Sequence, residues 1–142
     1  MIIKSISKKD SSACFELDKI TINLWTHQQW INELENESIR ASAIFFDEII
    51  TGISISQLTI DEVELRYLSI HPDFKRRGLG KKLIENLIIQ CKVDKVKRIF
   101  LEVSSNNKIA LNFYNLLGFK TIGFRKKYYR DGSDGLLKEK LL

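Results

Sequence analysis

Hydrophobic and polar residues along the chain follow two periods, one of two residues and one near four. Between Glu62 and Ile70 they alternate, which predicts a half-buried strand, and Pro72 ends it. The residues expected on one face of that strand are Val63, Leu65, Tyr67 and Ser69. After residue 78 the apolar residues recur at four-residue steps, which predicts an amphipathic helix. Its apolar positions are Leu79, Leu83, Leu87 and Cys91.

Shorter segments complete the expected order of elements. Runs rich in β-branched and aromatic residues predict further strands over Ile2–Ile6, Ile39–Phe46, Ile49–Leu58, Val96–Val103, 120–129 and Leu136–Leu142. Asp47-Glu48 separates two of them and indicates an antiparallel hairpin, and residues 131–135 form a second turn. Helices are expected over 8–20, over 26–35 with Thr26 as N-cap, and over 107–117 with Gly118 just past the end.

This order predicts a single mixed α/β domain over residues 1–142, with a mostly antiparallel sheet of about seven strands flanked by about four helices. The composition is that of a globular protein, with 44% hydrophobic residues, seven glycines and one proline. No apolar run approaches the roughly 20 residues of a membrane helix, and the N-terminus lacks the apolar core of a secretory signal. We therefore expect a cytoplasmic protein without membrane partners.

Cysteine and histidine are scarce, which bears on metal and thiol chemistry. Cys14 and Cys91 are far apart, so a disulfide framework is not expected. Both fall in predicted helices and are interpreted as small core residues rather than nucleophiles. His27 and His71 are the only histidines, and no spacing typical of metal ligands occurs, so no metal site is expected.

The net charge of +5 is compatible with an anionic partner and equally with a mildly basic solvated surface. The charge is locally dense in HPDFKRRGLGKKL, just before the long helix. A helix start offers free N–H groups and partial positive charge, and Gly78 and Gly80 let a ligand approach the backbone. With Arg76, Arg77 and Lys81 around them, they predict a pyrophosphate cradle. The alternative is a basic turn with a glycine for tightness.

Two motifs give this loop a context. Both resemble motifs of the GCN5-related N-acetyltransferase (GNAT) superfamily. The acetyl-CoA loop of that superfamily is similar to RRGLG, and its Asn-x-x-Ala-x-x-x-Tyr-x-x-x-Gly-Phe signature is similar to SSNNKIALNFYNLLGF further along the chain. The resemblance is close over residues 65–134. Within the superfamily, LEVSSNNKIALNFYNLLGF and RKKYYRDGSDG are most similar to the ribosomal-protein-alanine N-acetyltransferases.

The resemblance implies direct transfer of an acetyl group from acetyl-CoA to an amine. An acceptor amine must lose a proton, so a base is needed. Glu102, in the Leu-Glu-Val motif near a strand end, is the candidate base; the alternative is a structural glutamate bound to a nearby lysine. Tyr114 is the candidate acid toward the CoA sulfur; the alternative is a buried core aromatic. His71, next to the preceding strand, stays open as a base.

The resemblance also implies which residues bind the two substrates. Asn107 would orient pantetheine, cap the following helix, or do both. The cofactor residues are expected to be Leu68, Ser69, Ile70, Arg76, Arg77, Gly78, Leu79, Gly80, Lys81 and Asn107. In the family the strand over 62–70 splays from the next one, and a backbone N–H there stabilises the oxyanion. Acceptor contacts are expected from Trp25, Tyr128 and Tyr129.

Three functions remain open on the sequence alone. The first is acetylation of a protein N-terminus, such as that of a ribosomal protein. The second is acetylation of a small-molecule amine or a lysine side chain, in a pocket lined by Trp25, Trp30 and Tyr129. The third is a nucleic-acid-binding module that uses the basic segment KRRGLGKK and the segment FRKKYYR, since basic residues beside aromatic ones can hold phosphates and stack bases. The modest net charge and scattered acidic residues disfavour the third.

Overall fold

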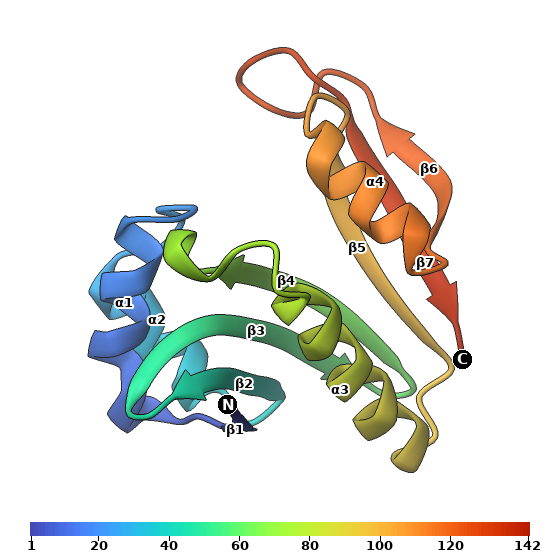
Figure 1. Ribbon diagram of the computed structural model, residues 1–142. Helices are drawn as coiled ribbons and strands as arrows, with labels where there is room; N and C mark the ends of the chain where they lie inside the picture. The colour runs from blue at the N-terminus through green and yellow to red at the C-terminus, as the bar shows by residue number, and fades with distance from the viewer.

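A seven-stranded sheet runs through the computed structural model, which describes residues 1–142 (Figure 1). Its strand order is β1-β2-β3-β4-β5-β7-β6, and only the pair β4–β5 is parallel. The strands are β1 (Ile2–Ser5), β2 (Ile39–Phe46), β3 (Ile49–Thr59), β4 (Glu62–Ile70), β5 (Arg98–Ser104), β6 (Lys120–Arg125) and β7 (Gly135–Leu141). The expected mixed, mostly antiparallel sheet of seven strands is confirmed.

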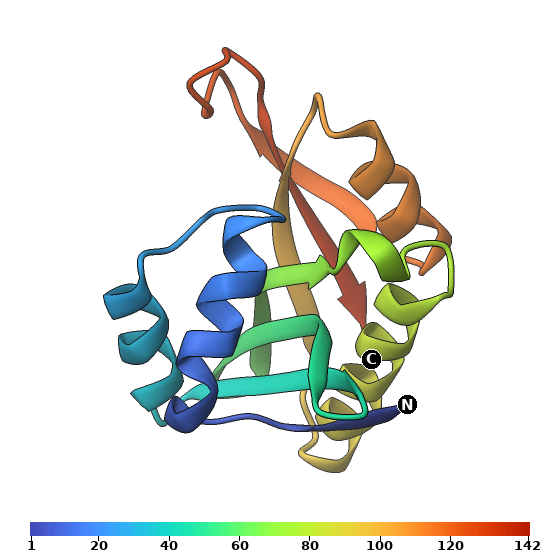
Figure 2. The same ribbon diagram turned by 60° about the vertical axis from the view of Figure 1, so that its left-hand side comes forward.

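Four helices cover the sheet: α1 (Ser11–Lys19), α2 (His27–Glu35), α3 (Leu79–Val93) and α4 (Lys108–Leu116). Short 3₁₀ turns over Lys8–Asp10 and Pro72–Phe74 precede α1 and α3. The helices α1 and α2 lie together on one side of β2–β4, α3 lies on the other, and α4 lies with β5–β7 (Figures 1 and 2). The core is therefore split between the two faces of the sheet.

The ends of the elements follow local backbone chemistry. Thr26 caps α2 as expected, because its hydroxyl accepts from the Gln29 N–H at 3.1 Å while Gln29 reaches back to the Thr26 N–H. Gly118 ends α4 with φ of 89°, and the Phe119 N–H donates to the Tyr114 carbonyl at 3.0 Å. The strand expected to reach residue 129 instead ends at Arg125, since Lys127 has a left-handed φ of 51°.

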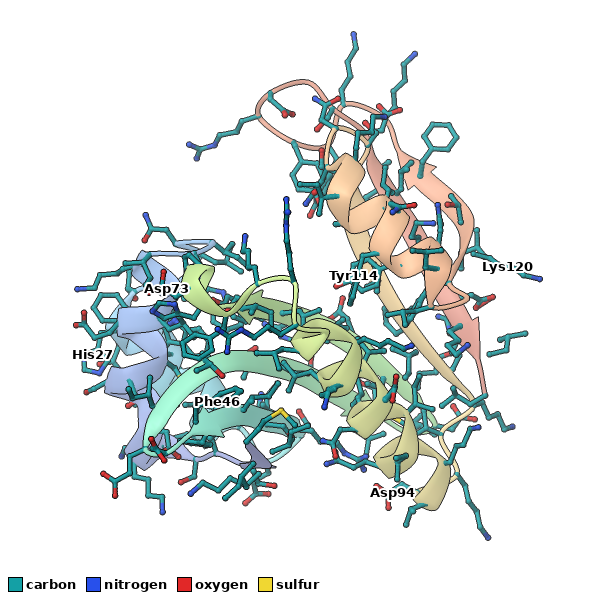
Figure 3. The ribbon with its side chains drawn as sticks, in the orientation of Figure 1. His27, Phe46, Asp73, Asp94, Tyr114 and Lys120 are labelled. Atoms are coloured by element: carbon teal, nitrogen blue, oxygen red, sulfur yellow. The ribbon has the colours of Figure 1, made fainter.

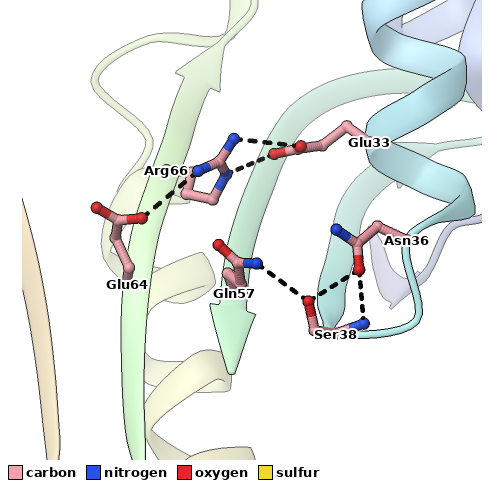
Figure 4. Close-up of polar contacts among 6 residues, drawn as sticks. All are labelled: Glu33, Asn36, Ser38, Gln57, Glu64 and Arg66. Atoms are coloured by element: carbon pink, nitrogen blue, oxygen red, sulfur yellow. Dashed lines mark hydrogen bonds and ion pairs between the residues drawn. The ribbon is translucent and has the colours of Figure 1, made fainter. Parts of the chain in front are cut away.

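One expectation about β4 is wrong. Val63, Leu65 and Tyr67 do not share a face: the first two pack with α3, whereas Tyr67 packs with α1 and α2. The reason is a bulge, because Leu65 pairs with Ser56 and Tyr67 with Ile55, which leaves Arg66 as an extra residue. From this position Arg66 Nε donates to Glu33 Oε2 of α2 at 2.6 Å, and its guanidinium also lies 3.5 Å from Glu64 (Figure 4).

The strands β4 and β5 part immediately before this bulge. They pair only over Glu62–Glu64 and Arg98–Phe100, although both continue for several more residues. A bulge bends its strand and increases the local twist, so the remainder of β4 turns away from β5. Two facing strand edges are thereby left without partners in the middle of the sheet, and the two halves of the molecule open around them (Figure 1).

Asp18 ties the helical layer to the bent part of β4. Its side chain is fully buried and accepts hydrogen bonds from the backbone N–H groups of Leu24 and Trp25, from Trp30 Nε1 at 3.0 Å and from the Tyr67 hydroxyl at 2.9 Å. Burial acts to raise the pKa of Asp18, but these donors outweigh it and hold the pKa below its usual value. The carboxylate thus fixes the α1–α2 loop.

We predict that Asp18→Asn lowers the free energy of unfolding at pH 7 by roughly 2–4 kcal/mol, because buried donors lose their charged acceptor. The folded pKa of Asp18 lies below the unfolded value of about 3.9, so its contribution is complete above that pH and is lost as the pH falls further. The difference between the two proteins should therefore shrink below about pH 4. Urea denaturation at a series of pH values measures both effects.

Asp47→Asn is the matched control, because Asp47 is exposed in the β2–β3 turn and makes no side-chain hydrogen bond or ion pair. We expect its unfolding free energy to stay within about 0.5 kcal/mol of the unmodified chain. Equal destabilisation by the two substitutions would contradict the anchoring role of Asp18.

Candidate active site

A cleft of about 380 Å³ opens where β4 and β5 part. Its walls come from both strands, from the α1–α2 loop, from α4 and from the segment between β6 and β7. Ten of the 14 residues that line it are hydrophobic, and Glu102 is its one carboxylate. A larger hollow of about 500 Å³ lies between β2 and the C-terminal half of α3, but it carries none of the residues singled out in the sequence.

Glu102 lies on β5 at the floor of the cleft, with 20% of its side chain exposed. Its Oε2 lies 3.1 Å from Nε of Arg125, at the end of β6. The backbone of Gly135 is close behind it: a Cβ at that position would lie 3.2 Å from Glu102 Cδ. The alternative expected from the sequence was a lysine as the structural partner of this glutamate, whereas the partner is an arginine on β6, the strand beyond β7.

Tyr114 reaches from α4 toward the cleft (Figure 3). The ring is buried between Phe113 and Phe119, with centroids 5.0 and 5.5 Å away. Its hydroxyl makes no hydrogen bond within the chain, and burial raises the pKa of Tyr114 well above its usual range. The phenol is therefore protonated at neutral pH and has a hydrogen available for a ligand in the cleft.

The glycine loop forms the N-terminus of α3. Gly78 is its N-cap residue with φ of 73°, no side chain caps this end of the helix, and Arg76 is also left-handed with φ of 63°. The first N–H groups of α3 are therefore free to bind an anion. Arg76 and Arg77 are exposed beside them, with the Arg77 guanidinium 4.9 Å from the Phe74 ring centroid.

Leu79 and Gly80 of this loop also contribute to packing within the protein. The Leu79 side chain is buried against Ile44 and Leu83, so only its backbone can face a ligand. A Cβ on Gly80 would lie 3.2 Å from the Phe113 ring, so the glycine lets α3 begin close to α4. Lys81 is exposed and lies 3.8 Å from Glu85. None of residues 76–81 lines the cleft itself.

The strand residues expected at the cofactor differ in their placement. Leu68 lines the cleft, whereas Ser69 and Ile70 lie beyond it along β4. Ser69 is buried, and its hydroxyl has no hydrogen-bond partner. Asn107 lines the cleft and caps α4, because its Oδ1 accepts from the Ala110 N–H at 3.1 Å. The capping role expected for Asn107 is confirmed.

The aromatic residues expected at the acceptor fall into two groups. Tyr129 lines the cleft, and its pKa is raised by burial and by the nearby Glu102 carboxylate. Tyr128 is half-exposed, edge-on to Tyr129, with Arg125 lying 5.0 Å from its ring centroid. Trp25 stacks on Tyr67 at 5.3 Å and does not line the cleft.

A pocket wall formed by Trp30 is ruled out, because this side chain is fully buried and bonded to Asp18. The cleft is instead bordered on that side by Ile22 and Leu24, which no motif in the sequence had indicated. Both are about half exposed in the α1–α2 loop. The one signal in the sequence is that two large apolar residues stand in the segment between two predicted helices, where such residues are often exposed for binding.

Both histidines and both cysteines of the chain lie outside the cleft. His71 Nδ1 accepts from the Asp73 N–H at 3.1 Å, and His27 stacks on Phe15 at 5.3 Å. Both cysteines are buried, as expected, and burial together with nearby carboxylates raises the pKa of Cys14 to about 12. No group of three or more His, Cys, Asp or Glu is placed to hold a metal ion.

None of the helices combines the length and apolar character needed to cross a membrane.

Comparison with known proteins places this geometry in a family. A sequence model of the acetyltransferase (GNAT) family matches residues 8–119. The chain is 31% identical over 135 residues to the [ribosomal protein bS18]-alanine N-acetyltransferase of Haemophilus ducreyi, which covers 93% of the chain and 92% of that protein. It is 37% identical over 83 residues to the enzyme of the same name from Salmonella typhimurium, over 58% of the chain and 56% of that protein.

A crystal structure of the ribosomal-protein-S18-alanine N-acetyltransferase from Escherichia coli superposes with a TM-score of 0.92. The sequence identity is 26%, and the superposition covers 99% of this chain and 92% of that one.

We predict that Gly80→Val weakens binding of acetyl-CoA at least tenfold, because its branched side chain meets Phe113 and crowds the backbone at the start of α3. Isothermal titration calorimetry measures the affinity directly. Gly123→Val on β6 is the matched control, since a Cβ there meets nothing within 4 Å. An affinity equal to that of the unmodified chain would show that the α3 N-terminus does not hold the ligand.

Proposed function

Because this chain belongs to the GNAT family of acetyltransferases, we propose that it acetylates the N-terminal α-amino group of a protein, such as a ribosomal protein. Members of this family are acetyl-CoA-dependent N-acetyltransferases. The observation that carries the finer proposal is the parting of β4 and β5, which leaves the Glu102 carboxylate and the buried Tyr114 phenol on the walls of the same cleft. The similarity to ribosomal-protein-alanine acetyltransferases supports the choice of acceptor.

The donor fits the part of the molecule around the start of α3. A CoA diphosphate requires N–H donors and positive charge, and the uncapped helix with Arg76, Arg77 and Lys81 offers both. Pantetheine carries amide groups that can pair with a free strand edge, which β4 provides beyond Glu64. The backbone of Leu68–Ile70 and the side chain of Asn107 are the proposed contacts along this path.

Glu102 is the proposed base. An α-amino group has a pKa of about 7.7–8.0 and is largely protonated at neutral pH, so it must lose a proton before it can attack. The carboxylate lies on the floor of the cleft and is partly open to solvent, which gives the proton an exit. The ion pair with Arg125 fixes one carboxylate oxygen at 3.1 Å and leaves the other to face the amine.

Tyr114 is the proposed acid. Attack of the acceptor nitrogen on the carbonyl carbon forms the amide and breaks the carbon–sulfur bond, and the departing thiolate must be protonated. Burial raises the pKa of Tyr114, so its hydroxyl carries a proton at neutral pH and is not engaged by the protein. Glu102 thus takes the proton that the ammonium group loses before attack, and the proton of Tyr114 passes to sulfur. The second proton, which the nitrogen loses as the amide forms, returns through solvent to the Tyr114 phenolate.

The acceptor is proposed to enter between the α1–α2 loop and the β6–β7 segment. Ile22 and Leu24 lie on one border of the cleft, and Tyr129, with Tyr128 beside it, comes from the other segment. An opening between two loops admits the end of an extended chain. The absence of nucleic-acid binding and the cytoplasmic location stay predictions.

Incubation with acetyl-CoA and a panel of peptides tests the acceptor class. The panel contains peptides that begin with Ala or Ser, their N-terminally blocked counterparts with an internal lysine, and small polyamines. Mass spectrometry should show one acetyl group on the free N-terminus of the unblocked peptides alone. Faster acetylation of blocked peptides or polyamines would contradict the proposal and favour a lysine or small-amine acceptor.

We predict that Glu102→Gln lowers kcat about 10²–10³-fold and shifts the pH–rate profile to higher pH, because the acceptor amine must then lose its proton to solvent, while the affinity for acetyl-CoA stays within twofold. Glu139→Gln is the matched control, because Glu139 also forms an arginine ion pair at 3.1 Å, with Arg98, on the neighbouring strand away from the cleft. It should leave kcat nearly unchanged. Similar rates for the two variants would remove Glu102 from the role of base.

A further inference from the structure

The turn after β5 and the loop between β6 and β7 are bonded to each other. The Ser105 N–H donates to the Asp134 carbonyl at 2.9 Å, and the Asp134 N–H donates to the Ser105 hydroxyl at 3.0 Å. The loop, residues 126–134, contains no strand or helix of its own. Its conformation therefore depends on bonds of this kind.

A chain of hydroxyl groups makes the second connection. The Asn106 N–H donates to Ser104 Oγ at 3.1 Å, Ser104 Oγ lies 2.6 Å from Ser133 Oγ, and Ser133 Oγ donates to Asp131 Oδ1 at 2.6 Å. The hydrogen of Ser133 is used on the carboxylate, so Ser104 must be the donor to Ser133. Each hydroxyl in the chain thus both accepts and donates, and Ser133 is buried.

Asp131 closes this arrangement at the surface. Besides the Ser133 hydroxyl, it accepts from the Ser133 N–H at 2.9 Å and from Asn106 Nδ2 at 3.3 Å. These donors, the Ser133 hydroxyl first, lower the pKa of Asp131, so it remains charged over the neutral range. A charged acceptor strengthens the bonds that end on it.

The residue that these bonds hold in place is Tyr129. Its N–H donates to the Ser133 carbonyl at 3.1 Å, and its carbonyl accepts from the Gly132 N–H at 2.9 Å. The Tyr129 side chain lines the cleft together with Glu102 and Ser104. The inner end of the hydroxyl chain, Ser104, therefore also lines the cleft, two residues after the proposed base.

We propose that Ser133 and Asp131 are positioning residues for the acceptor: they bind the β6–β7 loop to the end of β5 and so fix Tyr129 at the mouth of the cleft. Without them, ordering the loop costs conformational entropy that acceptor binding must supply. The residues expected to hold acetyl-CoA lie on β4, α3 and the α4 N-cap, and donor binding should be spared. This inference rests on the proposed entry of the acceptor between the two loops.

We predict that Ser133→Ala raises KM for the acceptor peptide about tenfold, while kcat and KM for acetyl-CoA change by less than about threefold. The substitution leaves Ser104 and Asp131 without their shared partner, and a lost buried hydrogen bond accounts for an effect of this size. Ser133→Thr keeps the hydroxyl and should restore most of the acceptor affinity. Steady-state kinetics with each substrate varied in turn measure the two KM values.

Ser38→Ala is a closely matched control. Ser38 makes the same two bonds to a residue two positions earlier, from its N–H and its hydroxyl to Asn36 Oδ1 at 2.9 and 2.8 Å, and Gln57 donates to its hydroxyl (Figure 4). It stands just before β2 and does not line the cleft. This variant should lose similar local bonding yet leave KM for the acceptor unchanged.

Asp131→Asn provides a second variant that retains the shape of the exposed side chain, in case Ser133→Ala does not fold. It should raise KM for the acceptor severalfold in the same selective manner. An acceptor KM equal in Ser133→Ala and Ser38→Ala, or an equal rise for acetyl-CoA and acceptor, would overturn the inference while the proposed function stands. An unmodified chain that acetylates no peptide N-terminus overturns the proposed function, and this inference with it.

Discussion

The parting of β4 from β5 is the constraint on which the rest of the molecule depends. Three pairs of residues hold the two strands together, and the extra residue Arg66 then bends β4 away. A sheet that pairs along its whole length would have no space between these strands. Because it opens here, the floor of the cleft is made of strand, so Glu102 stands on a rigid element. The loops that surround it can vary without disturbing that floor.

Much of the fold could be predicted from the sequence, because its signals are local. The alternation in β4, the four-residue period of α3, the Thr26 cap and the Gly118 stop each depend on neighbours within a few residues. The order of the elements then restricts the architecture. The end of β6 could not be predicted, because Lys127 has a left-handed backbone that its residue type does not indicate, whereas a glycine or a proline would have indicated a turn.

The candidate site was predicted in part, and its gaps have a common origin. Glu102, Tyr114, Leu68, Asn107 and Tyr129 do line one cleft. The partner of Glu102, the wall formed by the α1–α2 loop and the anchoring role of Asp18 all arise from contacts between segments distant in sequence. The bulge also made the predicted shared face of β4 wrong, since one inserted residue reverses the face of every residue after it.

The unpaired edges of β4 and β5 have a consequence for how such a scaffold can diversify. An open strand edge recognises amide groups in an extended chain and is indifferent to the side chains that they carry. The β4 edge beyond Glu64 can thus keep the same pattern of bonds whatever the identity of the molecule beside it. Selectivity is then delegated to a few residues at the rim, and a new preference can evolve there through a handful of substitutions while the folded framework is inherited intact.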